Sequence, residues 1–269
     1  MNTKQMPVAV AVVALLLAVG SAQASPIKPG LPTYSWLEDD GAGSTITAQY
    51  GGNNGTKTSA ASWSTTTPFS YSGNHSILAG NTGAFTAPGG TLGTTGTMSM
   101  WLDRTVSSTQ TYIVFDDSGT TGNRSYLTAR DDTSSENSIN GSSPNTMAAT
   151  TGLFTQNTWY LLTVTWTPTV LTYYVDGVVK GTGTGPGVNT SSGGTWYVGM
   201  LNNPGLPLPW LGLMDEVAVW NTALSTDNIA WLQSNSLSTI AIPEPSSLSL
   251  LGLLGGAFLL RRKLCRQRR

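Results

Sequence analysis

Residues 159–166, WYLLTVTW, and residues 170–177, VLTYYVDG, decide the fold class. Both stretches are rich in aromatic and β-branched residues, and apolar side chains alternate with polar ones, which is typical of β-strands. They predict strands over Trp159–Thr167 and Val170–Val175. Asp176-Gly177 follows directly and readily adopts the positive φ angles of a tight hairpin turn. The sequence therefore predicts an antiparallel hairpin at this point.

Stretches with the same strand-like composition and alternation occur before and after the hairpin in the sequence. Five further stretches predict strands: Thr97–Leu102, Tyr112–Phe115, Ser125–Arg130, Trp196–Met200 and Leu211–Trp220. One short helix is expected, with Ser225 as its N-cap, Asp227 near its positive end, and Ile229 and Leu232 along its apolar edge. Position 228 is Asn, where a capping box would place Glu or Gln. Many strands without a long amphipathic helix predict an all-β antiparallel sandwich.

The composition suits an extracellular protein and excludes several functions. Only 10% of the 269 residues are charged, and 31 are glycines. Segment 25–242 holds six basic residues against 13 acidic ones, so it lacks the basic stripe that nucleic-acid binding requires. The single cysteine, Cys265, lies near the C-terminus. The central segment therefore has no intrachain disulfide and no thiol to act as a nucleophile or metal ligand.

Residues 1–24 have the pattern of a signal peptide for export. Lys4 supplies a positive charge, Val8–Val19 form an apolar core, and Ala22 and Ala24 form a small-x-small cleavage site for signal peptidase. The alternative is an uncleaved membrane anchor. Cleavage after Ala24 would make Ser25 the first residue of the mature chain.

A second apolar run lies near the other end of the chain. Leu248–Leu260 would make a helix of about 20 Å, shorter than the ~30 Å apolar core of a bilayer. The arginines and the lysine after it would stay on the cytoplasmic side. This arrangement predicts transient anchoring in the inner membrane with the domain outside.

Pro243-Glu244-Pro245, the short Leu/Gly run and the Arg-rich end together resemble the PEP-CTERM sorting signal of Gram-negative bacteria. That resemblance implies an exosortase that cuts near the motif and sends the protein to the cell surface or extracellular matrix. A plain tail anchor is the alternative. The expected organisation is a signal peptide at 1–24, a domain at 25–236, a linker at 237–245, and a hydrophobic sorting helix with basic tail at 246–269.

The central motifs also resemble a family, the laminin-G-like, concanavalin A-like jelly rolls. The motifs are TMSMW at 97–101, WYLLTVTW at 159–166, YYVDG at 173–177, WYVG at 196–199 and LGLMDEVAVWNTALS at 211–225. The resemblance runs from about Tyr34 to Leu232 and is strongest after Trp159. It implies a concanavalin-like jelly-roll sandwich that binds ligands through loops at its rim.

Catalysis is not expected. A glycosidase places two carboxylates on either side of the scissile bond, but the acidic pairs here are adjacent, and neighbouring residues on a strand point to opposite faces. These pairs are Asp116-Asp117, Asp131-Asp132 and Asp215-Glu216. His75 is the only histidine, which excludes a zinc site built from histidines.

Asp215 is the candidate metal ligand. By alternation it shares a face with Leu213 and Val217, where a carboxylate needs hydrogen bonds or a cation. The family resemblance implies a structural calcium ion here, with Asp39 and Asp40 as candidate helpers. The chain departs from the family at 48–49, where Ala-Gln stands in place of an expected Asp. The alternative is that Asp215 caps backbone groups of a loop.

Trp210 follows a Pro-rich loop, with Asn202 and Asn203 just before it. An exposed Trp beside amides would stack on a sugar ring, whereas a buried one would fill the core. Together these features predict an exported, non-catalytic surface or matrix protein that binds polysaccharide or acts as an adhesin. The alternatives are a carbohydrate-active enzyme on the same fold and a purely structural matrix component.

Overall fold

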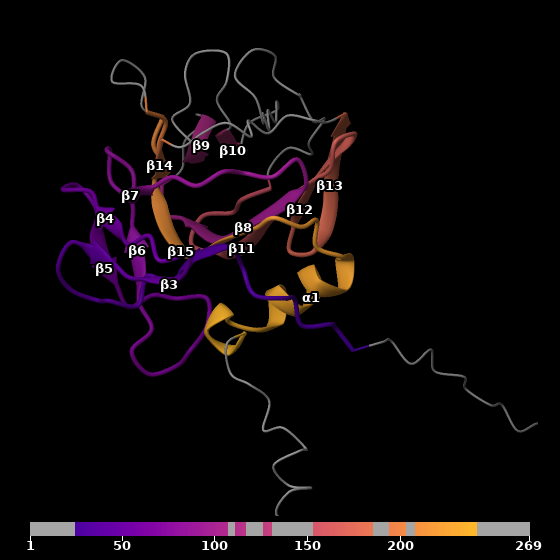
Figure 1. Cartoon of the computed structure of the whole chain (residues 1–269). Helices are drawn as coiled ribbons and strands as arrows, with labels where there is room; N and C mark the ends of the chain where they lie inside the picture. Colours follow the sequence, from indigo (N-terminus) through magenta and orange to yellow (C-terminus); the bar gives the residue numbers. More distant parts are fainter. Residues whose placement is uncertain are drawn as a thin grey trace, which may run out of the picture.

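Two antiparallel sheets stack face to face in the computed structural model (Figure 1), which describes residues 25–106, 111–116, 126–130, 153–184, 194–202 and 208–240. The two terminal segments lie outside this range. Ala22, Ala24 and Pro243-Glu244-Pro245 are therefore outside the described residues, as is Asn203.

One sheet has nine strands. Its main path runs β13-β12-β11-β8-β15-β1-β3, with β6 also paired to β15 and β5 paired to β6. Its strands are β1 Tyr34–Trp36, β3 Ala48–Tyr50, β5 Ser62–Ser64, β6 Ser76–Leu78, β8 Gly96–Arg104, β11 Trp159–Trp166, β12 Val170–Val175, β13 Val178–Thr184 and β15 Gly212–Trp220.

The other sheet has six strands in the order β10-β9-β14-β7-β4-β2. They are β2 Thr45–Ile46, β4 Gly55–Lys57, β7 Phe85–Pro88, β9 Thr111–Asp116, β10 Tyr126–Arg130 and β14 Thr195–Val198. Every pairing between these strands is antiparallel, which is consistent with the predicted jelly-roll sandwich.

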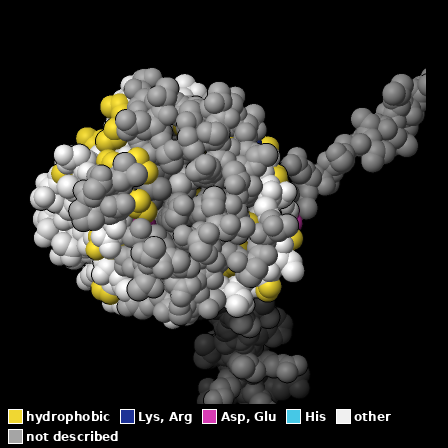
Figure 2. All heavy atoms as spheres, turned by 90° about the horizontal axis from the view of Figure 1, so that it is seen from above, with side chains coloured by type: hydrophobic (Ala, Val, Ile, Leu, Met, Phe, Trp, Pro, Cys, Tyr) yellow, Lys and Arg dark blue, Asp and Glu magenta, His cyan; other side chains and the backbone are white. Residues whose placement is uncertain are grey.

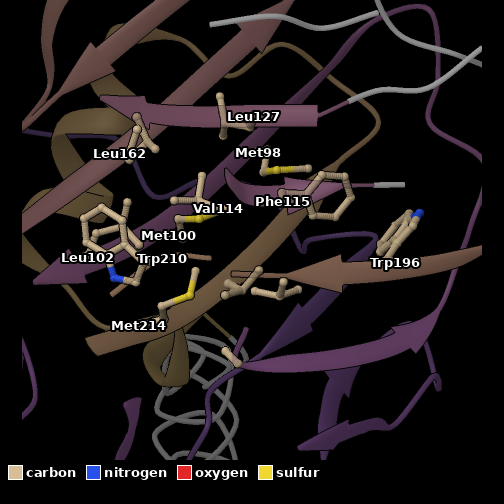
Figure 3. Packing of buried hydrophobic residues seen from close by; sticks show 14 of the residues in the cluster. Met98, Met100, Leu102, Val114, Phe115, Leu127, Leu162, Trp196, Trp210 and Met214 are labelled. Carbon is tan, nitrogen blue, oxygen red and sulfur yellow. The ribbon is translucent and has the colours of Figure 1, made fainter. Parts of the chain in front are cut away.

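The main core lies between the two sheets (Figure 3). Trp196 of β14 is fully buried, and its ring meets Tyr34, Trp36 and Phe115 at centroid distances of 4.9, 6.0 and 5.3 Å. Met98 and its apolar neighbours on the nine-stranded sheet complete the contact. Because burial of such side chains is the main force in folding, this layer sets which residues of each strand face outward.

The predicted hairpin is confirmed. Val175 of β12 pairs with Val178 of β13 across the turn, and Asp176 and Gly177 have φ angles of 51° and 71°. Along its other edge β12 pairs with β11, from Leu171 opposite Trp166 to Val175 opposite Leu162. Asp176 also accepts a hydrogen bond from the backbone N–H of Leu161 at 2.9 Å. These two positive angles are those of the tight turn that the dipeptide predicted.

A second, smaller core lies on the outer face of the nine-stranded sheet. The helix α1, Thr226–Ser234, covers this face and buries Ile229 and Leu232, as predicted. Ser225 caps α1, and the Asn228 side chain completes a capping box by accepting from the backbone N–H of Ser225 at 3.2 Å. Asn therefore performs the role that usually belongs to Glu or Gln.

The domain continues past its predicted end at Ser236. The short 3-10 helix η1, Leu237–Thr239, follows α1, and Leu237 and Ile240 are buried in the second core. The predicted linker boundary at 237 is therefore wrong, because these side chains pack against the sheet. No helix within the described ranges is long and apolar enough to cross a membrane.

Candidate functional site

Strand β15 carries an irregularity that determines the geometry of its acidic residues. On one edge, Leu213–Met214 pair with β6 and Val217–Val219 pair with β1. Between these two partners the register against β8 shifts, and Glu216 takes a φ of 52°. This is a β-bulge, an extra residue that changes the phase of the side chains.

The bulge overturns the predicted orientation of Asp215. Asp215 pairs with Trp101 on the α1 side of the sheet, whereas Val217 and Val219 face the main core. The prediction that Asp215 shares their face was wrong, because strict alternation fails at Glu216. Asp215 and Glu216 are both buried, although adjacent strand residues were expected to point to opposite faces.

Four acidic residues gather at this point and are named here the carboxyl cluster: Glu38, Asp39, Asp215 and Glu216. Glu38 follows β1, is fully buried, and has a φ of 56°. Both carboxyl oxygens of Glu38 and Asp215, and Oε1 of Glu216, have no hydrogen-bond partner of good geometry. Unsatisfied buried oxygens are uncommon in folded proteins, so each needs a physical explanation.

Burial dominates the protonation of the cluster. It raises the pKa of Glu38 and of Asp215 well above the usual range. The neighbouring carboxylates of Glu216 and Asp39 raise both pKa values further, and that of Glu38 also raises the pKa of Asp215. Burial raises the pKa of Glu216 to about 8, against smaller opposing effects of Ser236 and the N–H of Leu237. Burial likewise raises the pKa of Asp39. All four groups therefore favour the neutral form more than an exposed carboxyl does.

Of the three predicted calcium ligands, Asp39 and Asp215 lie in the carboxyl cluster, and Asp40 does not join them. Asp39 accepts hydrogen bonds from the Tyr71 hydroxyl at 3.0 Å and the His75 N–H at 3.2 Å. Asp40 is exposed and accepts from the backbone N–H and hydroxyl of Thr47 instead. In the part of the chain that the structure describes, no group of three or more His, Cys, Asp or Glu side chains is arranged to hold a metal ion. Calcium takes six to eight oxygens, which include backbone carbonyls and waters, so a calcium ion at Asp215 stays a prediction.

Trp210 belongs to the core. It is 1% exposed and lies among buried apolar side chains (Figure 3). Its Nε1 donates to the Leu213 carbonyl at 3.1 Å, and its ring meets Phe154 edge-on at 6.1 Å. A buried indole offers no ring face to a sugar, so the Trp210 side chain cannot stack on a ligand in this structure. Asn202 lies after β14, where its backbone N–H donates to the Asp116 carboxylate at 2.7 Å.

A different set of side chains lies in one line across the outer face of the six-stranded sheet. Tyr197 pairs with Thr86, Thr86 with Thr56, and Thr56 with Thr45. These four residues, named here the hydroxyl row, are all at least partly exposed. Four neighbouring strands at ~4.8 Å spacing give the row a length of about 14 Å.

The row faces outward because its neighbours along each strand face inward. Trp196, Phe85 and Ile46 are fully buried in the main core. The row thus presents three hydroxyls and a phenol ring that hydrogen-bond or stack against a polar ligand. Sequence reasoning missed it because β2, β4 and β7 have only two to four residues each. Seen from above, the described surface shows scattered apolar side chains and no gathering of lysine or arginine (Figure 2).

The chain belongs to the Laminin_G_3 family of the concanavalin A-like lectin/glucanases superfamily, which matches residues 78–230. The match covers more than half of the chain and includes the long strands of the nine-stranded sheet. A comparison with curated proteins found no match.

Solved structures of similar fold include binding domains and enzymes. Domain 4 of AbnA, a GH43 extracellular arabinanase from Geobacillus stearothermophilus solved with arabinotriose, has a TM-score of 0.54 at 16% identity, and the match covers 77% of this chain and 100% of that domain. The receptor binding domain of botulinum neurotoxin D has a TM-score of 0.55 at 11% identity, covering 76% of this chain and 52% of that one.

The Trypanosoma rangeli sialidase in complex with the inhibitor DANA has a TM-score of 0.52 at 12% identity, covering 74% of this chain and 32% of the enzyme. This chain therefore spans about half of the toxin domain and about a third of the sialidase. At such low identities these likenesses establish the fold alone, and fold does not determine function.

Proposed function

We propose that this protein is an exported, non-catalytic surface or matrix protein that binds polysaccharide through the outer face of its six-stranded sheet. The observation that carries the proposal is the hydroxyl row. Its side chains lie in register on four adjacent strands, so the sheet itself fixes their spacing. A rigid line of hydroxyls beside a phenol ring suits an extended ligand that is itself rich in hydroxyl groups.

The fold comparisons support a sugar as the ligand. The arabinanase domain, which this chain covers completely, was solved with arabinotriose. That domain is one part of a larger enzyme, and it has the size of the domain described here. A binding role for the same fold in this chain is consistent with a partly exposed polar sheet face.

The location of the acidic residues argues for binding rather than hydrolysis. Asp215 and Glu216 are 0% and 2% exposed, and Glu38 is fully buried. A glycosidase needs two carboxyl groups in contact with the scissile bond, and a polysaccharide does not reach these three side chains. The runner-up function, a carbohydrate-active enzyme, would need carboxylates outside the carboxyl cluster.

Export and sorting remain part of the proposal. The apolar segment before Ser25 would direct export and be removed by signal peptidase. The Pro243-Glu244-Pro245 motif with its short apolar run and basic end would hold the chain in the inner membrane until an exosortase acts. The released domain would then reach the surface or matrix of a Gram-negative bacterium.

The test is a polysaccharide-binding screen with the full chain in mild detergent, scored for binding and for newly released reducing ends. Arabinans and sialylated glycans belong in the panel because of the fold comparisons. Tyr197→Ala is expected to weaken binding about tenfold, or ~1.4 kcal/mol. Thr172→Val, on β12 of the other sheet, is the control that should leave binding unchanged.

Three results separate the proposed functions. Binding without product release, weakened by Tyr197→Ala, supports the proposal. Release of reducing ends would refute the proposal and favour the alternative, a carbohydrate-active enzyme. If Thr172→Val weakens binding as much as Tyr197→Ala does, the hydroxyl row is not the binding site. If no polysaccharide binds, a structural role in the matrix becomes the better hypothesis.

A further inference from the structure

The hydroxyl row lies between two acidic residues. At one end, Asp116 of β9 pairs with Tyr197 of β14, so it lies one strand spacing, ~4.8 Å, beyond the row. Near the other end, Asp40 accepts hydrogen bonds from the backbone N–H and the hydroxyl of Thr47. Thr47 comes two residues after Thr45 and is exposed like it. A ligand that follows the row along its length therefore lies between two carboxyl groups.

The two acidic residues differ in their access to a ligand. Asp116 is fully buried, and its carboxylate accepts from the backbone N–H of Asn202 at 2.7 Å. Asp40 is exposed, so a group of the ligand can meet its carboxylate directly. An ionised carboxyl group only accepts hydrogen bonds. Asp40 can therefore bind a sugar hydroxyl, whereas it repels a carboxylate.

Lys57 is the basic residue beside the row in the sequence, but it points away from it. It follows Thr56 on β4 and pairs with Phe85, which is buried in the main core. Successive residues of a strand point to opposite faces, so Lys57 leaves the outer face at this point. Its Nζ donates to the Ala61 carbonyl at 2.6 Å and to the Thr58 carbonyl at 3.4 Å. This cation is held by backbone oxygens and is not presented to the row.

The remaining basic residues that the structure describes lie farther from the row. Three of them belong to the nine-stranded sheet or to the segment beside α1: Lys28, Arg104 and Lys180. Arg130 ends β10 opposite Thr111, which is five residues along β9 from Asp116, or about 17 Å. Arg124 lies outside the described residues. The acidic residues are thus closer to the row than these cations are.

The charge of the whole segment acts in the same direction. Segment 25–242 holds six basic residues against 13 acidic ones, which gives a net charge of −7. A field of this sign lowers the local concentration of polyanions and slows their association. An uncharged polymer is not affected in this way.

We propose that the hydroxyl row binds uncharged polysaccharides and excludes those that carry carboxylates, such as polyuronates and sialylated glycans. This inference rests on the proposed function, because it names the class of ligand that the same site takes. The row offers hydroxyls that both donate and accept, which match the hydroxyls of a sugar. A fixed carboxylate on the ligand would lose water against the row without gaining a cation, which is unfavourable.

The test compares uncharged polymers with carboxylated forms of the same polymers, using the full chain in mild detergent. Galactan is paired with polygalacturonate, and mannan and a soluble glucan are each paired with a form whose primary hydroxyls are oxidised to carboxylates. Arabinan and a sialylated glycan complete the panel because of the fold comparisons. Each uncharged polymer that binds is expected to bind about tenfold or more tightly than its carboxylated partner.

Salt dependence provides a second measurement. Between ionic strengths of about 0.02 M and 0.5 M, the affinity for an uncharged polymer should stay constant. Any binding of a carboxylated polymer should strengthen over the same range, because salt screens the repulsion.

Two variants separate the charge at the row from the charge of the whole domain. Thr56→Lys places a cation within the row, and it should raise the affinity for the carboxylated polymers about tenfold at low salt. Val178→Lys adds the same charge to the other sheet, so it should change that affinity less than about twofold. Both positions are exposed, so neither substitution disturbs the core.

The outcomes distinguish this inference from the proposed function. If carboxylated polymers or the sialylated glycan bind as tightly as the uncharged polymers, the inference is wrong and the polysaccharide-binding proposal stands. Equal gains in Thr56→Lys and Val178→Lys would also overturn it, because the preference would then come from the net charge and not from the row. If no polymer of either kind binds, the proposed function fails and this inference fails with it.

Discussion

Replacing Trp210 with Ala distinguishes a core residue from a ligand-binding residue. An aromatic side chain of this kind buries about 200 Å², worth ~5 kcal/mol at ~25 cal/mol per Å². Measured losses for Trp→Ala in cores are about 3–5 kcal/mol, because the cavity relaxes only in part. The hydrogen bond from Nε1 to the Leu213 carbonyl adds about 1 kcal/mol. We expect Trp210→Ala to lower the free energy of unfolding by about 4 kcal/mol.

For a domain of this size, such a loss lowers the melting temperature by roughly 8–16 °C. Urea denaturation followed by Trp fluorescence measures the free energy, and a thermal scan gives the second value. Val178→Ala is the control: Val178 is 56% exposed, so its change should stay within about 0.5 kcal/mol. A loss below about 1 kcal/mol for Trp210→Ala, together with lost glycan binding, would refute the core assignment.

Three further predictions concern stability. In Gly212→Ala the new Cβ would lie 2.1 Å from the Asp103 carbonyl oxygen on the paired strand, so we expect a loss of about 3 kcal/mol, whereas Gly30→Ala, with nothing within 4 Å, should be nearly neutral in urea denaturation. Equal midpoints for the two would contradict the tight pairing. Ser225→Ala removes the N-cap of α1 and should cost about 1 kcal/mol, while an unchanged denaturation midpoint would mean that the cap contributes nothing. Because burial raises the pKa of Glu216 from 4.5 to about 8, the free energy of unfolding should fall by about 5 kcal/mol between these two pH values through this group alone. Urea denaturation at pH 5 and pH 8 measures this change in the free energy of unfolding. If the protein is more stable at pH 8, the ionisation of Glu216 is not the dominant pH effect.

The long strands were predictable because each offers enough residues for its alternation to show. The predicted spans Trp159–Thr167 and Val170–Val175 agree with β11 and β12 to within one residue. Strand β13 contains Gly181 and Gly183, so its own composition does not indicate a strand, and only the preceding turn points to it. The strands before residue 96 have at most four residues each, too few to show a period of two.

The site was less predictable because it depends on contacts between distant parts of the chain. Nothing in the sequence Met-Asp-Glu-Val at 214–217 marks Glu216 as left-handed. The bulge occurs where the neighbour of β15 changes from β6 to β1. Both of these strands are distant from β15 in the sequence, so local sequence does not reveal the change. One extra residue then moved Asp215 to the other face of the sheet. The burial of Trp210 likewise depends on Phe154, more than fifty positions earlier in the sequence.

The attachment of Ser236–Ile240 to β15 has a mechanical consequence. Both ends of the described chain lie beside α1, where the Asn228 side chain also holds the Ile27 carbonyl at 2.9 Å (Figure 1). A pull on the chain beyond Ile240 is transmitted through η1 to β15, which has strands on both sides, rather than to an outer strand that would peel away one bond at a time. A tether at this end loads the middle of the sheet, so the sandwich resists traction with many hydrogen bonds at once.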